Sequence, residues 1–369
     1  MSALDQRWLP DDVHSTGKLV LDWVKLDSSP GPKGSSHISV GDIYRHRVVE
    51  ESNDSCFVQH SINLWIFPSA YILIFCLGLP VNCVALYAAY KQVKRKNELG
   101  VYLFNLTLAD LLYILTLPFW IDFTVHKDDW RAGNTMCQIC SFLTQTNLYA
   151  SSVFLCCISF DRYLGVVHPL QMTRVRTMRA AILISCFVWA SQSAFNLELL
   201  IESEVDKDTD RHILCYDIYP IEPWKAKLNY FRITFGFLIP LVLIVAFHCR
   251  IYNALRDNVA TLQHEKRRAA QLMLGITVGF TVCFTPFHAM LLVRSIMEKN
   301  CDVANSIFIP YRLSVALVSL NCILDPILYC FVSELSRRDI LLFTLRRSET
   351  RANEVSNNQI RNMSATIIL

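Results

Sequence analysis

The chain contains seven apolar blocks, each long enough to cross a lipid bilayer as a helix. A helix needs about 20 consecutive apolar residues to span the hydrocarbon core. The blocks occupy about residues 62–90, 99–124, 134–168, 177–199, 224–256, 265–299 and 303–332. With 53% hydrophobic and only 18% charged residues among 369, the chain is too apolar for a soluble protein of its length. The sequence therefore predicts an all-α membrane protein, a seven-transmembrane helix bundle.

The basic residues of the short connections predict the orientation of the bundle. Lys and Arg gather after blocks one, five and seven and before block four, whereas the alternate connections are mixed or acidic. Cytoplasmic loops carry the excess of Lys and Arg in membrane proteins. We therefore expect a multi-pass protein of the plasma membrane with its N-terminus outside. The net charge of +3 has the same origin, and we infer no nucleic-acid binding from it.

Four segments make up the expected organisation. Residues 1–61 are polar and lack the apolar core of a signal peptide, so they are expected to form an extracellular disordered tail. Residues 62–332 hold the seven helices. Residues 333–347 alternate basic and apolar side chains, as in a short amphipathic eighth helix on the membrane surface, and 348–369 form a cytoplasmic tail. Asn53 begins a glycosylation sequon on the predicted outer side.

Four of the fourteen cysteines lie at or near the predicted outer surface: Cys56, Cys137, Cys215 and Cys301. The outside of a cell is oxidising, so an even set of cysteines there predicts two disulfides. Cys140 lies one helical turn after Cys137 and is a rival partner. The pairing is open at this point.

Motifs spread over some 280 residues resemble those of rhodopsin-like G-protein-coupled receptors. Asp161-Arg162-Tyr163 closes the third block, and Asp325-Pro326-Ile327-Leu328-Tyr329 closes the seventh. Single landmark residues occupy the other blocks: Asn82, Asp110, Trp189, Pro240 and Pro286. Within this family, five further stretches resemble the proton-sensing group: 97–103, 115–120, 154–159, 283–288 and 319–322.

The resemblance implies a receptor that signals through heterotrimeric G proteins, with the stimulatory G protein and cyclic AMP as its output and arrestin as a further partner. It implies that Arg162 contacts the G protein after leaving Asp161, supported by Tyr163 and Tyr329. It also pairs Cys137 with Cys215 and leaves Cys56 for Cys301. No catalytic constellation and no metal-ligand spacing accompany these motifs, so the chain is not expected to be an enzyme.

Proton sensing requires groups that titrate between about pH 6 and 7.5, and histidine is the side chain whose unperturbed pKa lies there. Four of the ten histidines are expected at the outer surface or the outer cavity: His60, His126, His212 and His288. Acidification would charge them, and the acidic connection from Glu202 to Asp217 would attract them. The alternative is that exposed histidines titrate without any consequence for signalling.

Asp110 and Asp325 are expected to face the bundle interior, since lipid exposure of a carboxylate is prohibitive. Two neighbouring carboxylates at low dielectric cannot both ionise cheaply, so at least one should hold its proton. The resemblance implies a third acid at the position of Gln192, whose amide can hydrogen-bond the others but cannot titrate. The alternative role of the two acids is Na⁺ binding, and Na⁺ is the only cofactor that we expect.

A second hypothesis is a receptor for a lysolipid or another small anionic lipid, because lipid receptors resemble this group. Three arginines would then anchor the head group, namely Arg232, Arg294 and Arg312, and His288 would line the cavity. A transporter or channel is disfavoured, because the blocks show neither repeat symmetry nor a continuous polar path.

Overall fold

The computed structural model describes residues 63–168, 176–202, 205–207, 213–217, 219–257 and 263–332. All of them belong to one compact unit of the chain. Asn53, Cys56, His60 and His212 lie outside the described residues, as do the expected amphipathic helix and the cytoplasmic tail. Tyr329 lies in a described helix, but its side chain does not belong to the described part.

Within the described ranges, seven helical spans are long and apolar enough to cross a membrane, which confirms the predicted fold class. Four of them consist of one helix each: α3 (Asn63–Lys94), α6 (Asn134–Val167), α7 (Met178–Phe195) and α11 (Gln263–Met297). The second span is α4 (Glu98–Ile114) followed by α5 (Leu117–Val125), and the seventh is α12 (Cys301–Ser319) followed by α13 (Asn321–Val332). The fifth span joins three pieces: α9 (Pro223–Ile233), the π-helical turn η3 (Thr234–Leu238) and α10 (Ile239–Asp257).

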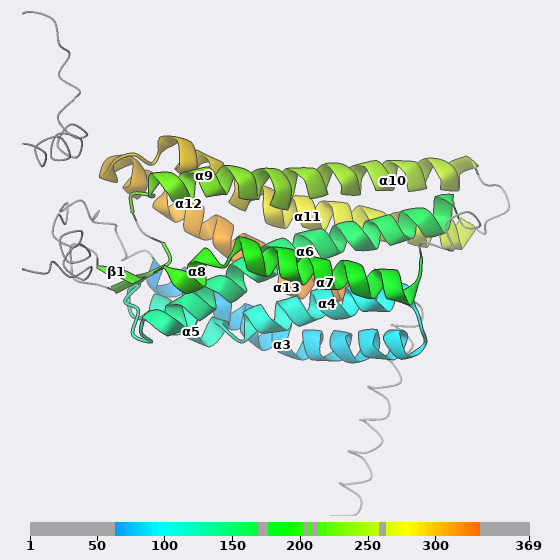
Figure 1. The fold of residues 1–369 in the computed structure, drawn as a ribbon, viewed down its shortest axis with the longest axis horizontal. Coiled ribbons are helices and arrows are strands. Elements are labelled where there is room, and N and C mark those ends of the chain that lie inside the picture. The colour runs from blue at the N-terminus through cyan, green and yellow to red at the C-terminus, as the bar shows by residue number, and fades with distance from the viewer. Residues whose placement is uncertain are drawn as a thin grey trace, which may run out of the picture. The chain divides into compact units, whose positions relative to one another are not determined.

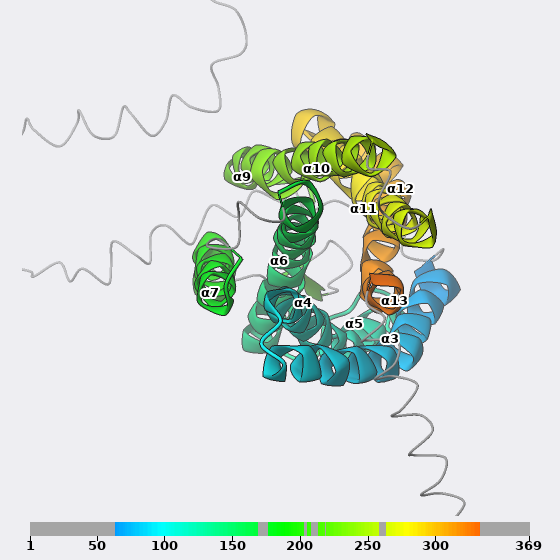
Figure 2. The same ribbon diagram turned by 90° about the vertical axis from the view of Figure 1, so that its right-hand side faces the viewer.

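The spans lie roughly side by side along one direction (Figure 1). Viewed along that direction, α6 occupies the middle of the bundle and α7 lies at its edge (Figure 2). The main hydrophobic core accordingly gathers side chains of α4, α6, α10 and α11, including Phe154, Phe280 and Phe284. Many large apolar side chains remain exposed on the spans, such as Phe187 at 72% and Leu274 at 64%. An apolar exterior around a core that buries Asn82 and Asp110 is the arrangement that a bilayer requires.

The fifth span changes its helical pitch just before Pro240. Proline has no backbone N–H to donate, so the helix must accommodate a missing hydrogen bond near that point. In η3 the carbonyl of Thr234 instead accepts from the N–H of Ile239, five residues on. The hydroxyl of Ser152 on α6 donates to the carbonyl of Gly236 at 2.6 Å, which ties the π-turn to the central helix.

A disulfide joins Cys137, in the first turn of α6, to Cys215 at the end of β2. The pairing is the one that the resemblance implied, and the rival Cys140 is a buried free thiol. Cys301 is disulfide-bonded as well, but its expected partner Cys56 lies outside the described residues. Strand β2 (Ile213–Cys215) pairs antiparallel with β1 (Val205–Lys207), after the short helix α8 (Glu198–Ile201). We call this end of the bundle the disulfide end and the opposite end the Arg162 end.

Candidate functional site

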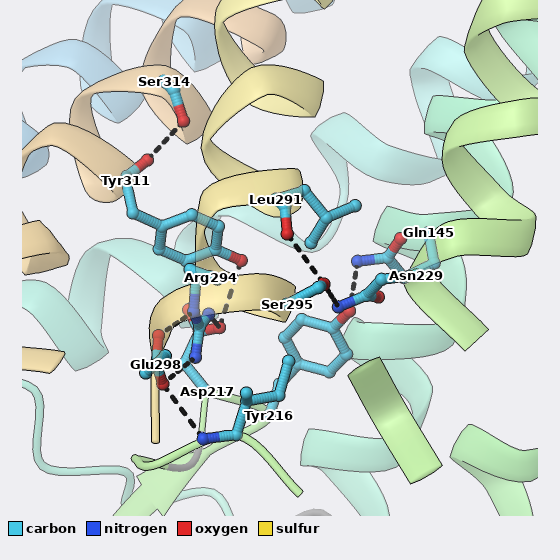
Figure 3. A network of polar contacts seen from close by, with 11 residues as sticks. Gln145, Tyr216, Asp217, Asn229, Leu291, Arg294, Ser295, Glu298, Tyr311 and Ser314 are labelled. Atoms are coloured by element: carbon cyan, nitrogen blue, oxygen red, sulfur yellow. Dashed lines mark hydrogen bonds and ion pairs between the residues drawn. The ribbon is translucent and has the colours of Figure 1, made fainter. Parts of the chain in front are cut away.

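A polar network at the disulfide end is centred on Arg294 of α11 (Figure 3). Its guanidinium donates to both carboxylate oxygens of Glu298, at 2.7 and 3.1 Å, and to Oδ1 of Asp217 at 3.1 Å. The same guanidinium lies over the rings of Tyr219 and Tyr311, at 4.7 and 4.3 Å from the centroids. A buried arginine is stable only when such partners satisfy its charge and its N–H groups.

The network fastens the loop that follows β2 to two helices. Tyr311 of α12 donates its hydroxyl to Asp217 at 3.2 Å, and Glu298, directly after α11, accepts from the backbone N–H of Ile221 at 3.0 Å. Burial, and after it the negative charge of Asp217, raises the pKa of Tyr219, so this phenol stays neutral at physiological pH. A change of charge on the loop would therefore be felt by α11 and α12 together.

A second buried arginine fastens the loop after α5 to the seventh span. Arg312 donates to Oδ1 of Asp128 at 2.8 Å, and both side chains are buried. The adjacent Asp129 accepts from the backbone N–H of Ile213 at 3.1 Å, and Trp130 N–H donates to the carbonyl of Ile213 at 2.7 Å. The loop thus connects α12 with β2.

His126 lies at the start of this loop, directly after α5. Its Nδ1 is 2.8 Å from the carbonyl oxygen of Asp122 and 3.2 Å from that residue's carboxylate. The imidazole is partly exposed to solvent. Protonation would convert the contact with Asp122 into an ion pair. His126 is the one proton-sensing candidate among the described residues that has a carboxylate partner of this kind.

His288 differs from its expected position. It is 1% exposed and stacks on Phe237 with ring centroids 4.5 Å apart, while its Nδ1 contacts the carbonyl of Phe284 at 2.9 Å. The cavity at the disulfide end is lined by its neighbour Phe287 instead. The prediction that His288 faces the outer cavity is therefore wrong, because the imidazole points toward the aromatic core of the bundle.

The three arginines proposed as anionic anchors are already neutralised. Arg294 and Arg312 are paired as described, and Arg232 donates to Glu198 at 2.6 Å and to Asn196 at 3.3 Å. Of the three, only Arg312 lines the cavity at the disulfide end, a space of about 700 Å³ bordered also by Tyr71, Tyr113 and Asn147. An anionic head group would have to displace a carboxylate from each arginine. This pairing argues against the hypothesis that the three arginines anchor an anionic head group.

Asp110 and Asp325 lie in the bundle core as expected, both of them buried. Asp110 Oδ1 accepts from Asn147 Nδ2 at 3.0 Å, whereas Oδ2 of each aspartate has no hydrogen-bond partner among the described residues. These orphaned buried oxygens fit a small cation such as Na⁺, which prefers oxygen ligands. Gln192 does not join them, because it lines a separate cavity beside Tyr149. The expected hydrogen bond from Gln192 to the two acids is therefore corrected.

At the Arg162 end, two arginines share one carboxylate. Arg162 donates to Asp161 at 3.0 Å, and Arg176 donates to the same carboxylate at 2.9 and 3.3 Å. Arg176 also pairs with Glu98 at 2.8 Å. Burial works against the charge of Arg176, but the hydrogen bond and the charge of Asp161 outweigh it and raise its pKa. The guanidinium is therefore charged throughout the physiological range. Tyr163 contacts His168 at 3.1 Å.

A comparison of the sequence with models of protein families agrees with the seven spans and with the motif at Asp161 and Arg162. The family model described as 7 transmembrane receptor (rhodopsin family) matches residues 81–329, more than half of the chain. The chain belongs to this family. The receptor is therefore not an enzyme, and membership implies a G protein as its partner and a multi-pass location in the plasma membrane.

Three relatives illustrate the similarity. The receptor is 44% identical to G-protein coupled receptor 68 of Mus musculus over 291 residues, 79% of this chain and 80% of the relative. It is 44% identical to G-protein coupled receptor 65 of Homo sapiens over 313 residues, 81% and 93% of the two chains. Lysophosphatidic acid receptor 6 of Mus musculus is 30% identical over 325 residues, 85% and 94% of the two chains.

Sequence reasoning missed several partners in the receptor's ion pairs, above all Glu98, Arg176 and Glu298. Glu298 could have been found, because it follows Arg294 by four residues at the end of a predicted helix, and residues at this spacing face each other. Glu98 begins α4 and Arg176 precedes α7, 78 positions later in the sequence, and no local pattern joins them.

Proposed function

We propose that this receptor responds to extracellular acidification and signals through a heterotrimeric G protein. The disulfide end then faces outward, as the basic residues of the opposite connections predict. The observation that carries the proposal is the polar network around Arg294, which ties the loop after β2 to α11 and α12. A charge that appears on the outer loops is coupled through it to two membrane-spanning helices.

Histidine is the side chain that can supply such a charge between pH 6 and 7.5. His126 starts the loop that holds Arg312 through Asp128, and His212 directly precedes β2 in the sequence. At high pH both imidazoles are neutral and the resting arrangement is favoured. Acid charges them, and His60 with them, and the loops repack around the new ion pairs.

The energy available from a few histidines is sufficient. A pKa difference of one unit between the two receptor states corresponds to about 1.4 kcal/mol for each histidine. Two or three coupled histidines therefore supply about 3–4 kcal/mol, enough to turn a minor conformation into the dominant one.

The response leaves the receptor at the Arg162 end. Arg162 is held there by Asp161, whose carboxylate also binds Arg176. Activation releases Arg162 toward the G protein, supported by Tyr163 and Tyr329. The resemblance favours the stimulatory G protein with cyclic AMP as the product, and arrestin as a later partner of the activated receptor.

The test is cyclic AMP accumulation in transfected cells over external pH 6 to 8. Replacing His60, His126 and His212 together by Phe removes the proton uptake that favours the active state. The response should therefore become shallower, with its midpoint displaced to lower pH. His288→Phe alone should leave the midpoint in place, since that imidazole is buried among aromatic rings. An unchanged midpoint in the triple variant would sink the histidine mechanism.

A lipid receptor is the second candidate, favoured by the cavity of about 700 Å³ and by the relative named for lysophosphatidic acid. The same assay separates the two functions when lysophosphatidic acid is added at constant pH. A flat pH curve together with a response to the lipid would reverse the ranking.

A further inference from the structure

A side cavity of about 370 Å³ lies between α6, α7 and the α9–η3 part of the fifth span. It shares no lining residue with the cavity at the disulfide end. Gln192, Asn196 and Arg232 form its polar side, and Tyr149 and Gly236 form its inner side.

The inner wall of this side cavity carries an unsatisfied polar group. Tyr149 is 3% exposed, and its hydroxyl has no hydrogen-bond partner in the described part of the chain. A buried hydroxyl without a partner costs free energy that a bound polar group would recover. The position of Tyr149 is enforced by packing, since a Cβ atom on Gly236 would lie only 2.3 Å from the ring.

The outer wall of the side cavity is aromatic and faces the hydrocarbon. Phe195, Phe231 and Phe235 line it and are 47%, 37% and 53% exposed. Phe231 lies against both of the others, with ring centroids 4.9 and 4.3 Å apart. All three belong to membrane-spanning segments. A ligand in the bilayer can therefore reach the polar side of the cavity by passing between these phenylalanines.

We propose that the side cavity binds a single-chain lipid with an uncharged, hydroxyl-bearing head group, of the monoacylglycerol class. The head group hydrogen-bonds Tyr149 and Gln192, and the acyl chain leaves between the phenylalanines into the membrane. A neutral head group is required by the electrostatics. Arg232 already pairs with Glu198 at 2.6 Å, so an anion would have to displace that carboxylate, and a cation would meet the guanidinium.

Occupancy of the side cavity would act on the π-turn of the fifth span. Tyr149 packs against Gly236 of η3 and meets the ring of His288 edge-on, with centroids 6.0 Å apart. π-Turns inside helices are frequent at functional sites. The bound lipid would stabilise this contact between α6, η3 and α11, and the inference does not depend on the response to acid.

The experiment measures thermal unfolding of the full chain, purified in detergent, as 1-oleoylglycerol is titrated. The wild type should melt at a higher temperature with the lipid. Tyr149→Phe should need about fivefold more lipid for the same shift, the loss that corresponds to one hydrogen bond. Without lipid this variant should melt no lower than the wild type, because its hydroxyl has no partner to lose. Gln192→Leu is a second variant, on the polar side of the cavity, and it should also need more lipid for the same shift.

Tyr219→Phe is the matched control. Its hydroxyl is likewise buried without a hydrogen-bond partner among the described residues, but it lies outside the lining of the side cavity. The lipid shift should be unchanged in this variant. The site is overturned if 1-oleoylglycerol does not shift the melting temperature of the wild type. It is also overturned if the lipid shifts Tyr149→Phe and Gln192→Leu as much as the wild type. A larger Tyr149-dependent shift with oleoyl lysophosphatidic acid or with cholesterol overturns the proposed lipid class.

Discussion

Buried arginines in this receptor occur with a carboxylate beside them, and this pairing limits what each of them can bind. Arg312 meets Asp128, Arg232 meets Glu198, and Arg294 lies between two acids. An uncompensated charge in a low-dielectric interior costs several kcal/mol, so these arginines hold the fold and are poor anchors for a further anion. Asp110 and Asp325 are different, because each keeps one carboxylate oxygen without a hydrogen-bond partner among the described residues.

This difference leads to a prediction about Na⁺. If the ion occupies the space beside Asp110 and Asp325, replacing NaCl by choline chloride should lower the melting temperature of the purified receptor. The stabilisation lost is about 1.4 kcal/mol when Na⁺ is present at ten times its dissociation constant. Asp110→Asn should abolish the difference between the two salts, while Asn replacing the exposed Asp302 should retain it. Equal melting of the wild type in both salts would contradict Na⁺ binding.

At the scale of elements, the fifth span consists of two α-helices joined by a π-helical turn. Its π-turn places Gly236 against Tyr149 and presents the Gly236 carbonyl to Ser152. The same turn holds Phe237 flat against His288 of α11. One irregular turn therefore sets the contact between the central helix and the fifth and sixth spans.

Gly236→Ala tests the close approach at this turn. The added methyl group would lie 2.3 Å from Cδ1 of Tyr149, so the two helices must separate. Overpacking of this kind costs about 1–3 kcal/mol of folding free energy. Gly165→Ala is the control, since its methyl group would lie 3.2 Å from the nearest atom of the Arg176 guanidinium, a contact that a shift of a few tenths of an ångström relieves. Thermal unfolding of the two variants should differ, and equal melting temperatures would refute the close contact.

At the scale of the whole molecule, the two ends of the bundle are held by long-range ion pairs. Asp128 and Arg312 are 184 residues apart, and Asp217 and Arg294 are 77 apart. At the other end Arg176 joins Asp161 to Glu98. The loops at both ends are in this way part of the folded bundle, and movement of a helix must rearrange them.

Asp128→Asn should be among the most destabilising single changes at the disulfide end. It leaves Arg312 buried without its carboxylate, and breaking a buried pair from one side costs roughly 3–5 kcal/mol. Arg131→Gln is the matched control, because it removes an exposed pair with Asp129 that is worth about 0–1 kcal/mol. Chemical or thermal unfolding of the purified variants measures both. If the Asp128→Asn receptor is as stable as the wild type, the ion pair between Asp128 and Arg312 does not contribute to the stability of the fold.

The sequence by itself determined the seven spans, because a chain in a bilayer must satisfy every backbone group within a helix of sufficient length. The predicted block 134–168, for example, became the helix Asn134–Val167. The motif around Asp161 was likewise readable in the sequence, and the resemblance to the receptor family supplied the pairing of Cys137 with Cys215, which the cysteine positions alone left open. Which face of a helix a side chain occupies, and what it meets there, depended on packing between distant segments. Only the tertiary structure therefore shows that His288 packs within the aromatic core, that Gln192 lies apart from the buried acids, and that each of the buried arginines described pairs with a carboxylate.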